Sequence, residues 1–211
     1  MTGAFITLEG LEGVGKSTCL AAVDEFISAA GHSGLITREP GGTPLGEKIR
    51  EWILLGNHDS LSAETEALLM FASRAQHLDE IIRPALSAGR WVVCDRFTDA
   101  TIAYQGGGRG VDPDWLDSLK SAVQRGLEPD LTLLLDAPVE VGLARISNRD
   151  PDHFEREDQA FFERVRETYL ELARGQPGRI KLIDATRPIA EVRAQLNARL
   201  TDFIQTFGVS T

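Results

Sequence analysis

Residues 10–17 read GLEGVGKS and match the phosphate-binding pattern GxxxxGK(S/T) at every defined position. An apolar run at 5–8 precedes this stretch, and apolar residues recur at helical spacing after Ser17 until Gly31. The expected unit is therefore a strand, a glycine-rich loop and a helix. Such a loop turns backbone N–H groups toward a polyphosphate at the helix N-terminus, where the helix dipole also favours an anion.

The loop predicts specific contacts with a nucleoside triphosphate. Lys16 is expected to place its charge on the β- and γ-phosphates, and the Ser17 hydroxyl to ligate Mg²⁺. A chance glycine-rich turn would leave both residues unexplained. The predicted triphosphate-binding residues are Gly10, Leu11, Glu12, Gly13, Val14, Gly15, Lys16, Ser17 and Thr18.

Five apolar runs of strand length recur along the chain, with helical periodicity between them. The predicted strands are 5–8, 34–37, 91–94, 131–135 and 180–183. Besides the helix after the loop, the predicted helices are 45–55, 63–86, 115–123, 139–147, 159–173 and 189–207. This alternation is typical of a parallel sheet covered by helices on both faces. We therefore predict an α/β P-loop NTPase fold with a five-stranded parallel sheet.

The composition is that of one α/β domain. The chain has 211 residues, 42% hydrophobic and 26% charged, so 1–211 is expected to form a single domain. No stretch approaches the roughly 18 consecutive apolar residues of a membrane-spanning helix, and the N-terminus lacks the pattern of a secretory signal. We expect a cytoplasmic protein with no membrane partner, in which Cys19 and Cys94 are reduced and buried.

The net charge of −10 argues against a broad nucleic-acid-binding surface, which needs a basic stripe. Small phosphorylated ligands need only a few converging cations. Arginines that could supply them occur beside the glycine-rich segments and in the later helices: Arg38, Arg96, Arg109, Arg145 and Arg149. The predicted partners are therefore small anions and not nucleic acids.

Polar residues directly follow three predicted strands, and ligands of open α/β sheets bind at the carboxyl ends of strands. Arg38 begins the turn REPGG (38–42), from which its guanidinium could grip a phosphate with two parallel bonds. Asp95 is placed to hold Mg²⁺ directly or through water, and Arg96 to face an anion. The alternatives are an ordinary strand-ending ion pair and a surface turn stiffened by proline and glycine.

Two helical patterns carry side chains suited to a nucleobase. Phe71 and Arg74 lie three residues apart and share a face, so that one could stack on a base and the other could bond to a carbonyl. Thr101, Tyr104 and Gln105 form a second polar face before the glycine run at 106–110. The alternatives are a core phenylalanine with a solvated arginine, and a plain helix end.

Irregular stretches at 40–44, 106–110 and 148–158 are expected to form loops over the site. The last of these mixes Arg149, His153 and Arg156 with five acidic residues. It is either a solvated linker between helices or a mobile lid whose cations close over the transferring phosphoryl group.

The segments GLEGVGKST, TREPGGT, CDRFTDATIAYQGGGRG and PDLTLLLD, with the Phe71/Arg74 helix and the charged lid, resemble bacterial thymidylate kinase along nearly the whole chain. The match is specific, because REPGGT, and DR followed closely by AYQGGGRG, are absent from most P-loop proteins. The resemblance implies a homodimeric, ATP-dependent nucleoside monophosphate kinase. Such an enzyme transfers the γ-phosphoryl group of ATP to dTMP with Mg²⁺, giving dTDP and ADP in dTTP biosynthesis.

The resemblance also implies a role for each candidate residue. The ATP site would combine the phosphate-binding loop with Arg145 and Arg149, and the dTMP phosphate would be held by Arg38 and Arg96. The implied catalytic residues are Lys16, Asp95, Arg96 and Arg149, and the implied metal ligands are Ser17 and Asp95. The implied base and sugar contacts are stacking by Phe71, a ring-carbonyl bond from Arg74, base recognition by Thr101, deoxyribose packing by Tyr104 and pocket lining by Gln105.

Glu12 is electrostatically unexpected inside a phosphate-binding loop. One subtype of the family has Glu at this position, directed toward the sugar, and supplies catalytic cations from the lid, which implies Arg149 and then Arg156. The family commonly reads Asp-Arg-Phe-Glu where this chain has DHFE at 152–155. A neutral His153 would stabilise phosphoryl charge less than arginine, so a catalytic His153 predicts a kcat that depends on pH near neutrality.

Two other functions fit the phosphate-binding loop. A kinase for another nucleoside monophosphate would share the machinery but not the base pocket. A nucleotide-dependent switch would bind partners without a phosphoryl acceptor. GTPase switches carry an NKxD motif, and the nearest sequence here is NRD at 148–150.

Overall fold

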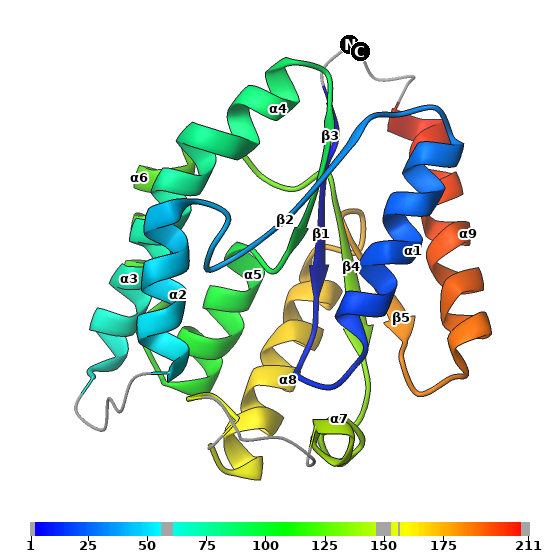
Figure 1. The fold of residues 1–211 in the computed structure, drawn as a ribbon. Coiled ribbons are helices and arrows are strands. Elements are labelled where there is room, and N and C mark those ends of the chain that lie inside the picture. The colour runs from blue at the N-terminus through cyan, green and yellow to red at the C-terminus, as the bar shows by residue number, and fades with distance from the viewer. Residues whose placement is uncertain (1–2, 56–60, 147–152, 156, 208–211) are drawn as a thin grey trace.

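The computed structural model describes residues 3–55, 61–146, 153–155 and 157–207. Its sheet is entirely parallel, with the strand order β2-β3-β1-β4-β5. The strands are β1 (Phe5–Glu9), β2 (Gly34–Arg38), β3 (Trp91–Asp95), β4 (Leu131–Asp136) and β5 (Ile180–Asp184). The predicted five-stranded parallel sheet is confirmed, and β1 lies at its centre (Figure 1).

Each strand runs one residue beyond its predicted range, and the added residue is always charged. These residues are Glu9, Arg38, Asp95, Asp136 and Asp184. A charged residue ends an apolar run in the sequence, but the backbone continues to pair: Arg38 lies opposite Asp95, and Asp136 lies opposite Asp184. Five charged side chains therefore meet at one edge of the sheet, where ligands of such folds bind.

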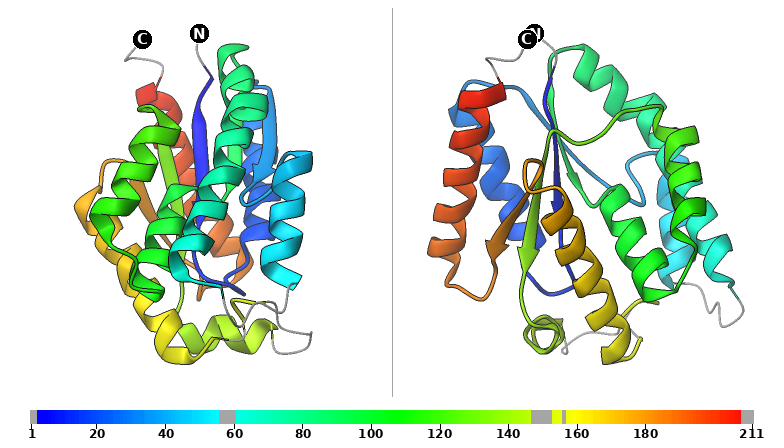
Figure 2. Two further views of the ribbon diagram at one scale, coloured as in Figure 1. Left: turned by 90° about the vertical axis from the view of Figure 1, so that its left-hand side faces the viewer. Right: turned by 180° about the vertical axis from the view of Figure 1, so that it is seen from behind.

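Helices cover both faces of the sheet, as predicted (Figures 1 and 2). Helices α1 and α9 pack together on one face, whereas α4, α5 and α8 cover the other and α2, α3 and α6 lie outside them. The α-helices are α1 (Lys16–Ala29), α2 (Pro44–Leu55), α3 (Ala63–His77), α4 (Arg83–Ser87), α5 (Thr98–Thr101), α6 (Pro113–Gln124), α7 (Val139–Ile146), α8 (Gln159–Gly175) and α9 (Ile189–Phe207).

Side chains that precede the helices fix where three of them begin. Ser62, Asp112 and Asp158 accept hydrogen bonds from the backbone N–H groups three residues later, at 3.2, 3.0 and 2.7 Å. These caps satisfy donors that the first turn of a helix leaves unpaired. Pro113 follows one cap directly, because its fixed φ suits the first helical position. Helix α6 therefore begins two residues before the predicted 115.

Two predicted segments need correction. The range 63–86 is helical, but π-helical segment η1 (Leu78–Ile82) separates α3 from α4. The predicted loop at 106–110 is wrong in part, because its first three glycines end a second π-helical segment, η2 (Ile102–Gly108). A Cβ at Gly107 would overlap Thr168 Oγ1, and one at Gly108 would overlap the Phe161 ring. These glycines allow η2 to pack closely on α8.

The main core lies between the sheet and its helical layers. Ile6, Val93 and Leu133, from the three central strands, are fully buried. Both cysteines, Cys19 and Cys94, are buried and free, as predicted. Among the described residues, no helix is long and apolar enough to cross a membrane.

Candidate active site

The loop between β1 and α1 has the conformation that its glycines predict. Gly10, Gly13 and Gly15 have φ values of +135°, +71° and +95°, which only glycine adopts freely. A Cβ at Gly10 would overlap the Leu135 carbonyl oxygen, and one at Gly13 would overlap that of Gly142. Gly15 precedes α1 without a capping side chain, so the first N–H groups of the helix remain available to an anion.

A cavity of about 520 Å³ opens beside this loop. Most predicted site residues line it, namely Glu12, Gly13, Gly15, Lys16, Ser17, Thr18, Arg74, Asp95, Arg96, Thr101, Tyr104, Gln105 and Arg145. The tertiary structure thus gathers these residues from five separate parts of the chain, 12–18, 74, 95–96, 101–105 and 145. Arg149 and Arg156 lie outside the described residues.

Gly10, Leu11 and Val14, also predicted to bind phosphate, are not part of the lining. Leu11 and Val14 are buried in the main core, where their side chains support the loop from behind.

Arg38 and Phe71 also do not line the cavity. Arg38 donates from Nη2 to Glu47 Oε2 at 2.7 Å, and its side chain is 51% exposed. The Phe71 ring is buried in a small apolar cluster with Leu116, 4.8 Å from Arg74 Cζ. Spacing predicted that Phe71 and Arg74 share a face, but it could not show that the Phe71 ring is buried in this cluster or that Glu47 pairs with Arg38.

Three buried side-chain atoms in the described residues lack a hydrogen-bond partner, and all three belong to residues that line this cavity. They are Arg74 Nη1, Asp95 Oδ1 and Arg96 Nη1. Buried polar groups are rarely left unpaired, because each costs about 1–3 kcal/mol. The cavity therefore lacks an acceptor for two guanidinium groups and a cation for one carboxylate.

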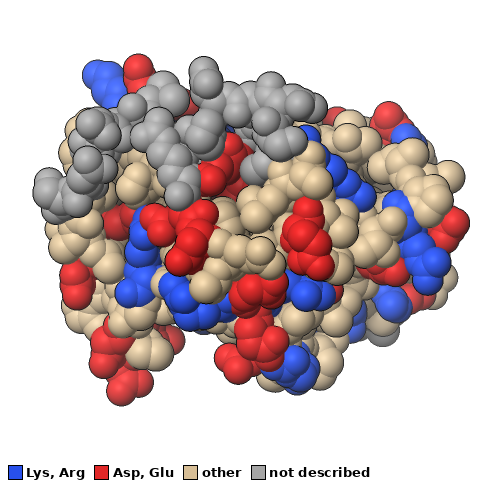
Figure 3. Space-filling view, turned by 90° about the horizontal axis from the view of Figure 1, so that it is seen from below, with Lys and Arg blue, Asp and Glu red and all other residues tan. Residues whose placement is uncertain are grey.

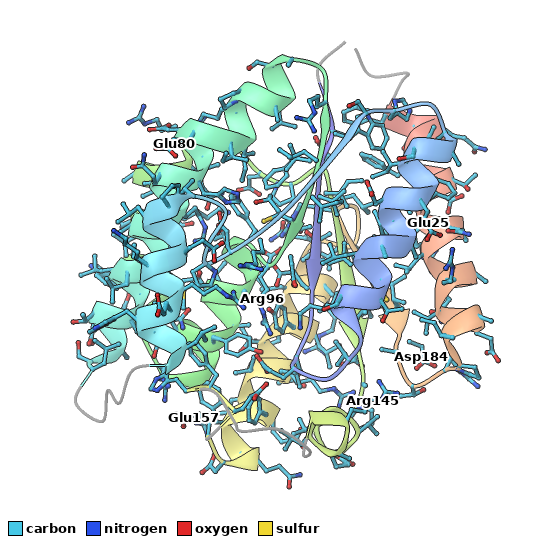
Figure 4. The ribbon with its side chains drawn as sticks, viewed as in Figure 1. Glu25, Glu80, Arg96, Arg145, Glu157 and Asp184 are labelled. Carbon is cyan, nitrogen blue, oxygen red and sulfur yellow. The ribbon has the colours of Figure 1, made fainter. Side chains whose placement is uncertain are left out.

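Arg96 lies at the centre of the site, and Figure 4 labels it near the middle of the molecule. It donates from Nη2 to Glu12 Oε1 at 2.7 Å, and its Cζ lies 4.8 Å from the centre of the Tyr104 ring. The Tyr104 hydroxyl donates to the other oxygen of Glu12 at 2.6 Å. Burial acts to raise the pKa of Glu12, but Arg96 and Lys16 outweigh it and the pKa lies below its ordinary value.

Lys16 bends back over its own loop, where Nζ donates to the carbonyl oxygens of Gly10 at 3.1 Å and Leu11 at 2.6 Å. Burial lowers the pKa of Lys16 to about 8, and the cation Arg96 acts in the same direction. Glu12 and Asp95 oppose this shift. An incoming phosphate would favour the charged form further.

Arg74 lines the cavity from α3 and is almost completely buried. It donates from Nε to Glu39 Oε2 at 2.7 Å and from Nη2 to Thr101 Oγ1 at 2.9 Å. Gln105 is held by Glu66, which accepts from its Nε2 at 2.7 Å. Arg74 and Thr101 are thus hydrogen-bonded to each other, whereas Gln105, which also lines the cavity, is held separately by Glu66.

Sequence reasoning missed Arg50, a cation that lines the cavity from α2 and donates from Nη1 to the Pro40 carbonyl oxygen at 3.1 Å. Burial lowers the pKa of Arg50, and neighbouring Arg38 adds to the effect. The available signal was its position on the helix that directly follows the REPGG turn.

Sequence reasoning also missed Glu9, which ends β1 beneath the site. Its carboxylate accepts from the Phe97 N–H and from the Tyr169 hydroxyl, both at 2.7 Å. Burial, and then the charge of Asp99, raise the pKa of Glu9 to about 7. A strand-ending glutamate has no sequence signal that separates it from an ordinary surface charge.

The described residues of the stretch predicted to be a lid, 153–155, 157 and 158, make several contacts with the rest of the chain. Phe154 and Glu155 line the cavity, and the Phe154 ring packs edge-on against Tyr104 at 5.5 Å. His153 instead places Nε2 3.3 Å from Glu66 Oε2, and its backbone N–H donates to the Leu54 carbonyl oxygen at 3.1 Å. His153 is not part of the cavity lining, so the geometry does not favour it as a catalytic lid cation.

Charge at the site differs from that of the whole chain. The cavity is lined by five cations, Lys16, Arg50, Arg74, Arg96 and Arg145, and by four carboxylates, Glu12, Glu39, Asp95 and Glu155, so cations are in slight excess there although the net charge of the chain is −10. Figure 3 looks onto the face where the strands end, and there basic and acidic side chains are interspersed. The attraction for an anion is therefore local, as predicted.

Comparisons with known proteins agree with this geometry. The family model described as "Thymidylate kinase" matches residues 8–196. A protein named thymidylate kinase from Pseudomonas savastanoi pv. phaseolicola is 53% identical over 206 residues, covering 97% of this chain and 98% of that protein. Another from Methylococcus capsulatus is 55% identical over 203 residues, covering 96% and 97%.

A solved structure gives the same result. The crystal structure of thymidylate kinase from Ehrlichia chaffeensis has a TM-score of 0.77 and 32% sequence identity, covering 95% of this chain and 99% of that one. The match to the family model includes the phosphate-binding loop, all residues that line the cavity and the strands between them. On the strength of its sequence, its fold and its site, the chain belongs to the thymidylate kinase family.

Proposed function

We propose that this protein, as a thymidylate kinase, transfers the γ-phosphoryl group of ATP to the 5′-phosphate of dTMP and releases ADP and dTDP. The three unpaired buried atoms in one cavity carry the proposal. Arg96 Nη1 can donate to a phosphate oxygen, and Arg74 Nη1 can donate to a carbonyl oxygen of the base. Asp95 Oδ1 can ligate a cation. One nucleotide, dTMP, and a divalent cation satisfy all three.

The donor half is the phosphate-binding loop with Lys16, Ser17 and Arg145. Arg145 reaches over the loop from α7, donating to the carbonyl oxygens of Gly13 at 3.4 Å and Ala185 at 3.2 Å (Figure 4). The loop N–H groups and Lys16 bind the ATP phosphates, whose oxygens replace the two loop carbonyls as partners of Lys16.

The residues present fit Mg²⁺. Asp95 supplies an unpartnered buried oxygen, and Ser17, which lines the same cavity, supplies a hydroxyl. Mg²⁺ needs only one or two protein oxygens beside substrate phosphates and water. When bound, it neutralises charge on the phosphates of the donor.

The acceptor half is the wall formed by β3, α2, α3 and η2. Arg96 and Arg50 hold the dTMP phosphate, and Arg38 joins them only by leaving its ion pair with Glu47. Arg74 and Thr101 contact the thymine base, Gln105 lines its pocket, and Tyr104 packs beneath the deoxyribose. The acceptor is already a phosphate oxygen, so positioning and charge neutralisation suffice without a nucleophilic side chain.

We assign this chain to the subtype with Glu in the phosphate-binding loop. Glu12 is turned toward the acceptor half by its bonds to Arg96 and Tyr104, which supports the assignment. Arg149 and Arg156 of the lid at 148–158 then supply the remaining cations. We further propose that 1–211 acts as one kinase domain in a cytoplasmic homodimer.

A coupled assay of ADP formation with dTMP, dUMP, dCMP, dGMP and AMP tests the function. We expect dTMP to have the highest kcat/KM, with dUMP as the nearest competitor because one methyl group is worth about 1–3 kcal/mol. A higher kcat/KM for another acceptor would identify a different monophosphate kinase. ADP formation at the same rate without any acceptor would identify an ATPase or a switch.

A further inference from the structure

A buried chain of hydrogen bonds leads from β2 to Arg74, behind the cavity wall. Thr37 Oγ1 lies 2.7 Å from His77 Nε2, and His77 Nδ1 lies 2.9 Å from Glu39 Oε1. The other oxygen of Glu39 accepts from Arg74 Nε at 2.7 Å. His77 has no exposed surface and does not line the cavity.

These hydrogen bonds leave one nitrogen of Arg74, Nη1, without a partner. Its Nη2 is committed to Thr101, and the rings of Phe71 and Phe97 lie 4.8 and 4.9 Å from its Cζ. Because the guanidinium is planar, fixing Nε and Nη2 also fixes the hydrogens of Nη1. Nη1 can only donate, so it favours a ring carbonyl over a ring amino group.

The REPGG turn closes over His77 and prevents it from reorienting. A Cβ at Gly42 would lie 2.5 Å from His77 Nε2, and the Gly41 N–H donates to Ser73 Oγ at 3.2 Å. An ionised carboxylate only accepts, so Nδ1 of His77 carries the hydrogen that it shares with Glu39. His77 thus holds one oxygen of Glu39 while Arg74 holds the other.

We propose that His77 is a positioning residue for base recognition, which acts through Glu39 to aim Arg74 Nη1 at a carbonyl of the acceptor base. The proposal rests on the proposed function in one respect, the contact between Arg74 and the base. Without the hydrogen on Nδ1, Glu39 Oε1 becomes a buried acceptor with no donor. It then competes for the hydrogens of Arg74 and turns the guanidinium away from the base.

A matched pair of variants isolates the bond to Glu39. The amide nitrogen of His77→Asn takes the place of Nδ1 and keeps that bond, whereas the longer side chain of His77→Gln reaches the Nε2 position and loses it. We expect His77→Gln to raise KM for dTMP about 10-fold and to lower the dTMP preference over dCMP by a similar factor. His77→Asn stays within about 3-fold of wild type.

The pattern of kinetic constants separates positioning from general destabilisation. For a positioning residue, kcat and KM for ATP of His77→Gln remain within about 2-fold of wild type. An equal rise in KM for dTMP in His77→Gln and His77→Asn would overturn the proposal. A KM for ATP that rises together with KM for dTMP would do the same.

A double-mutant cycle tests whether His77 acts through Arg74. In an Arg74→Ala background, adding His77→Gln should change KM for dTMP by less than about 2-fold. If the effects of His77→Gln and Arg74→Ala on KM for dTMP multiply in the double variant, the two residues act independently and the proposal is contradicted. An Arg74→Ala variant with unchanged KM for dTMP contradicts it as well. If His77→Gln does not fold, Thr37→Val replaces it, and the proposal then requires KM for dTMP to rise while KM for ATP does not.

The acceptor panel on the wild-type protein keeps the two proposals distinguishable. It tests the assignment of dTMP directly. The variants are compared for whichever acceptor the wild type prefers, so an error in the assigned function leaves the role of His77 testable.

Discussion

Arg96 has a positive φ of 67°, and its guanidinium group is largely buried. A left-handed backbone conformation costs on the order of 1–2 kcal/mol for a residue other than glycine, so the surrounding structure must stabilise this conformation of Arg96. The Arg96 N–H donates to the Leu8 carbonyl oxygen at 2.9 Å, and the next N–H donates to Glu9 at 2.7 Å. The end of β1 therefore fixes the turn that directs Arg96 into the cavity.

Charge removal at two cavity residues should reduce catalysis strongly. We expect Lys16→Ala and Arg96→Ala each to lower kcat/KM by at least about 10²-fold, because each removes a cation from a partly dry site. Steady-state kinetics with ATP and dTMP measure the effect. Arg193→Ala, which breaks an exposed pair with Glu25, is the control and should remain near wild type. Near-normal turnover in either cavity variant would remove that residue from the mechanism.

The raised pKa of Glu9 predicts how stability depends on pH. The folded state holds the proton of Glu9 up to about pH 7, whereas the unfolded chain releases it near 4.5. Between these values the folded state binds more protons, so the contribution of Glu9 to stability falls as pH rises. Denaturant unfolding at pH 5, 6, 7 and 8 should show the free energy of unfolding of wild type falling relative to that of Glu9→Gln. Exposed Glu191→Gln is the control, and parallel curves for wild type and Glu9→Gln would contradict the assignment.

At the scale of elements, part of the cavity lining depends on close packing between η2 and α8. Segment η2 carries Tyr104 and Gln105, and α8 contacts it through Thr168 and Phe161. The glycines of η2 bring the two backbones together, because a side chain at Gly107 or Gly108 would overlap α8. The same packing therefore positions two side chains that line the cavity.

Adding one methyl group to η2 should disturb both stability and substrate binding. We expect Gly107→Ala to lower the free energy of unfolding by about 1–3 kcal/mol, since Thr168 must move. KM for dTMP should rise as Tyr104 and Gln105 shift. Gly175→Ala is the matched control, because a Cβ there meets nothing within 4 Å. Equal stability of the two variants in denaturant unfolding would show that η2 and α8 are not tightly packed.

At the scale of the whole molecule, the strand order places the two halves of the site side by side. Strand β1 lies between β3 and β4, so the phosphate-binding loop emerges next to Asp95 and Arg96. Segments between β2 and η2 form the acceptor wall, and α7 reaches the donor side from beyond β4. A parallel sheet brings these ends to one edge, which gives a negatively charged protein a local cluster of cations.

Much of this arrangement was predictable from the sequence, because it depends on local patterns. The glycines of the loop, the period of the apolar runs and the charged strand ends determined the fold, the donor site and the positions of Asp95 and Arg96. Spacing placed Phe71 and Arg74 on one helical face and Thr101, Tyr104 and Gln105 on another, but it left open whether these faces meet a ligand, and the structure places four of the five in the cavity lining.

Only the tertiary structure decided which side chains already have partners. It pairs Arg38 with Glu47, buries Phe71 beside Arg74, and brings in Arg50, Glu9 and His77, none of which has a local signal. It also showed that the glycine run in η2 serves helix packing. These outcomes depend on which side chains are buried and which are paired in the folded protein, and short-range periodicity carries no information about either.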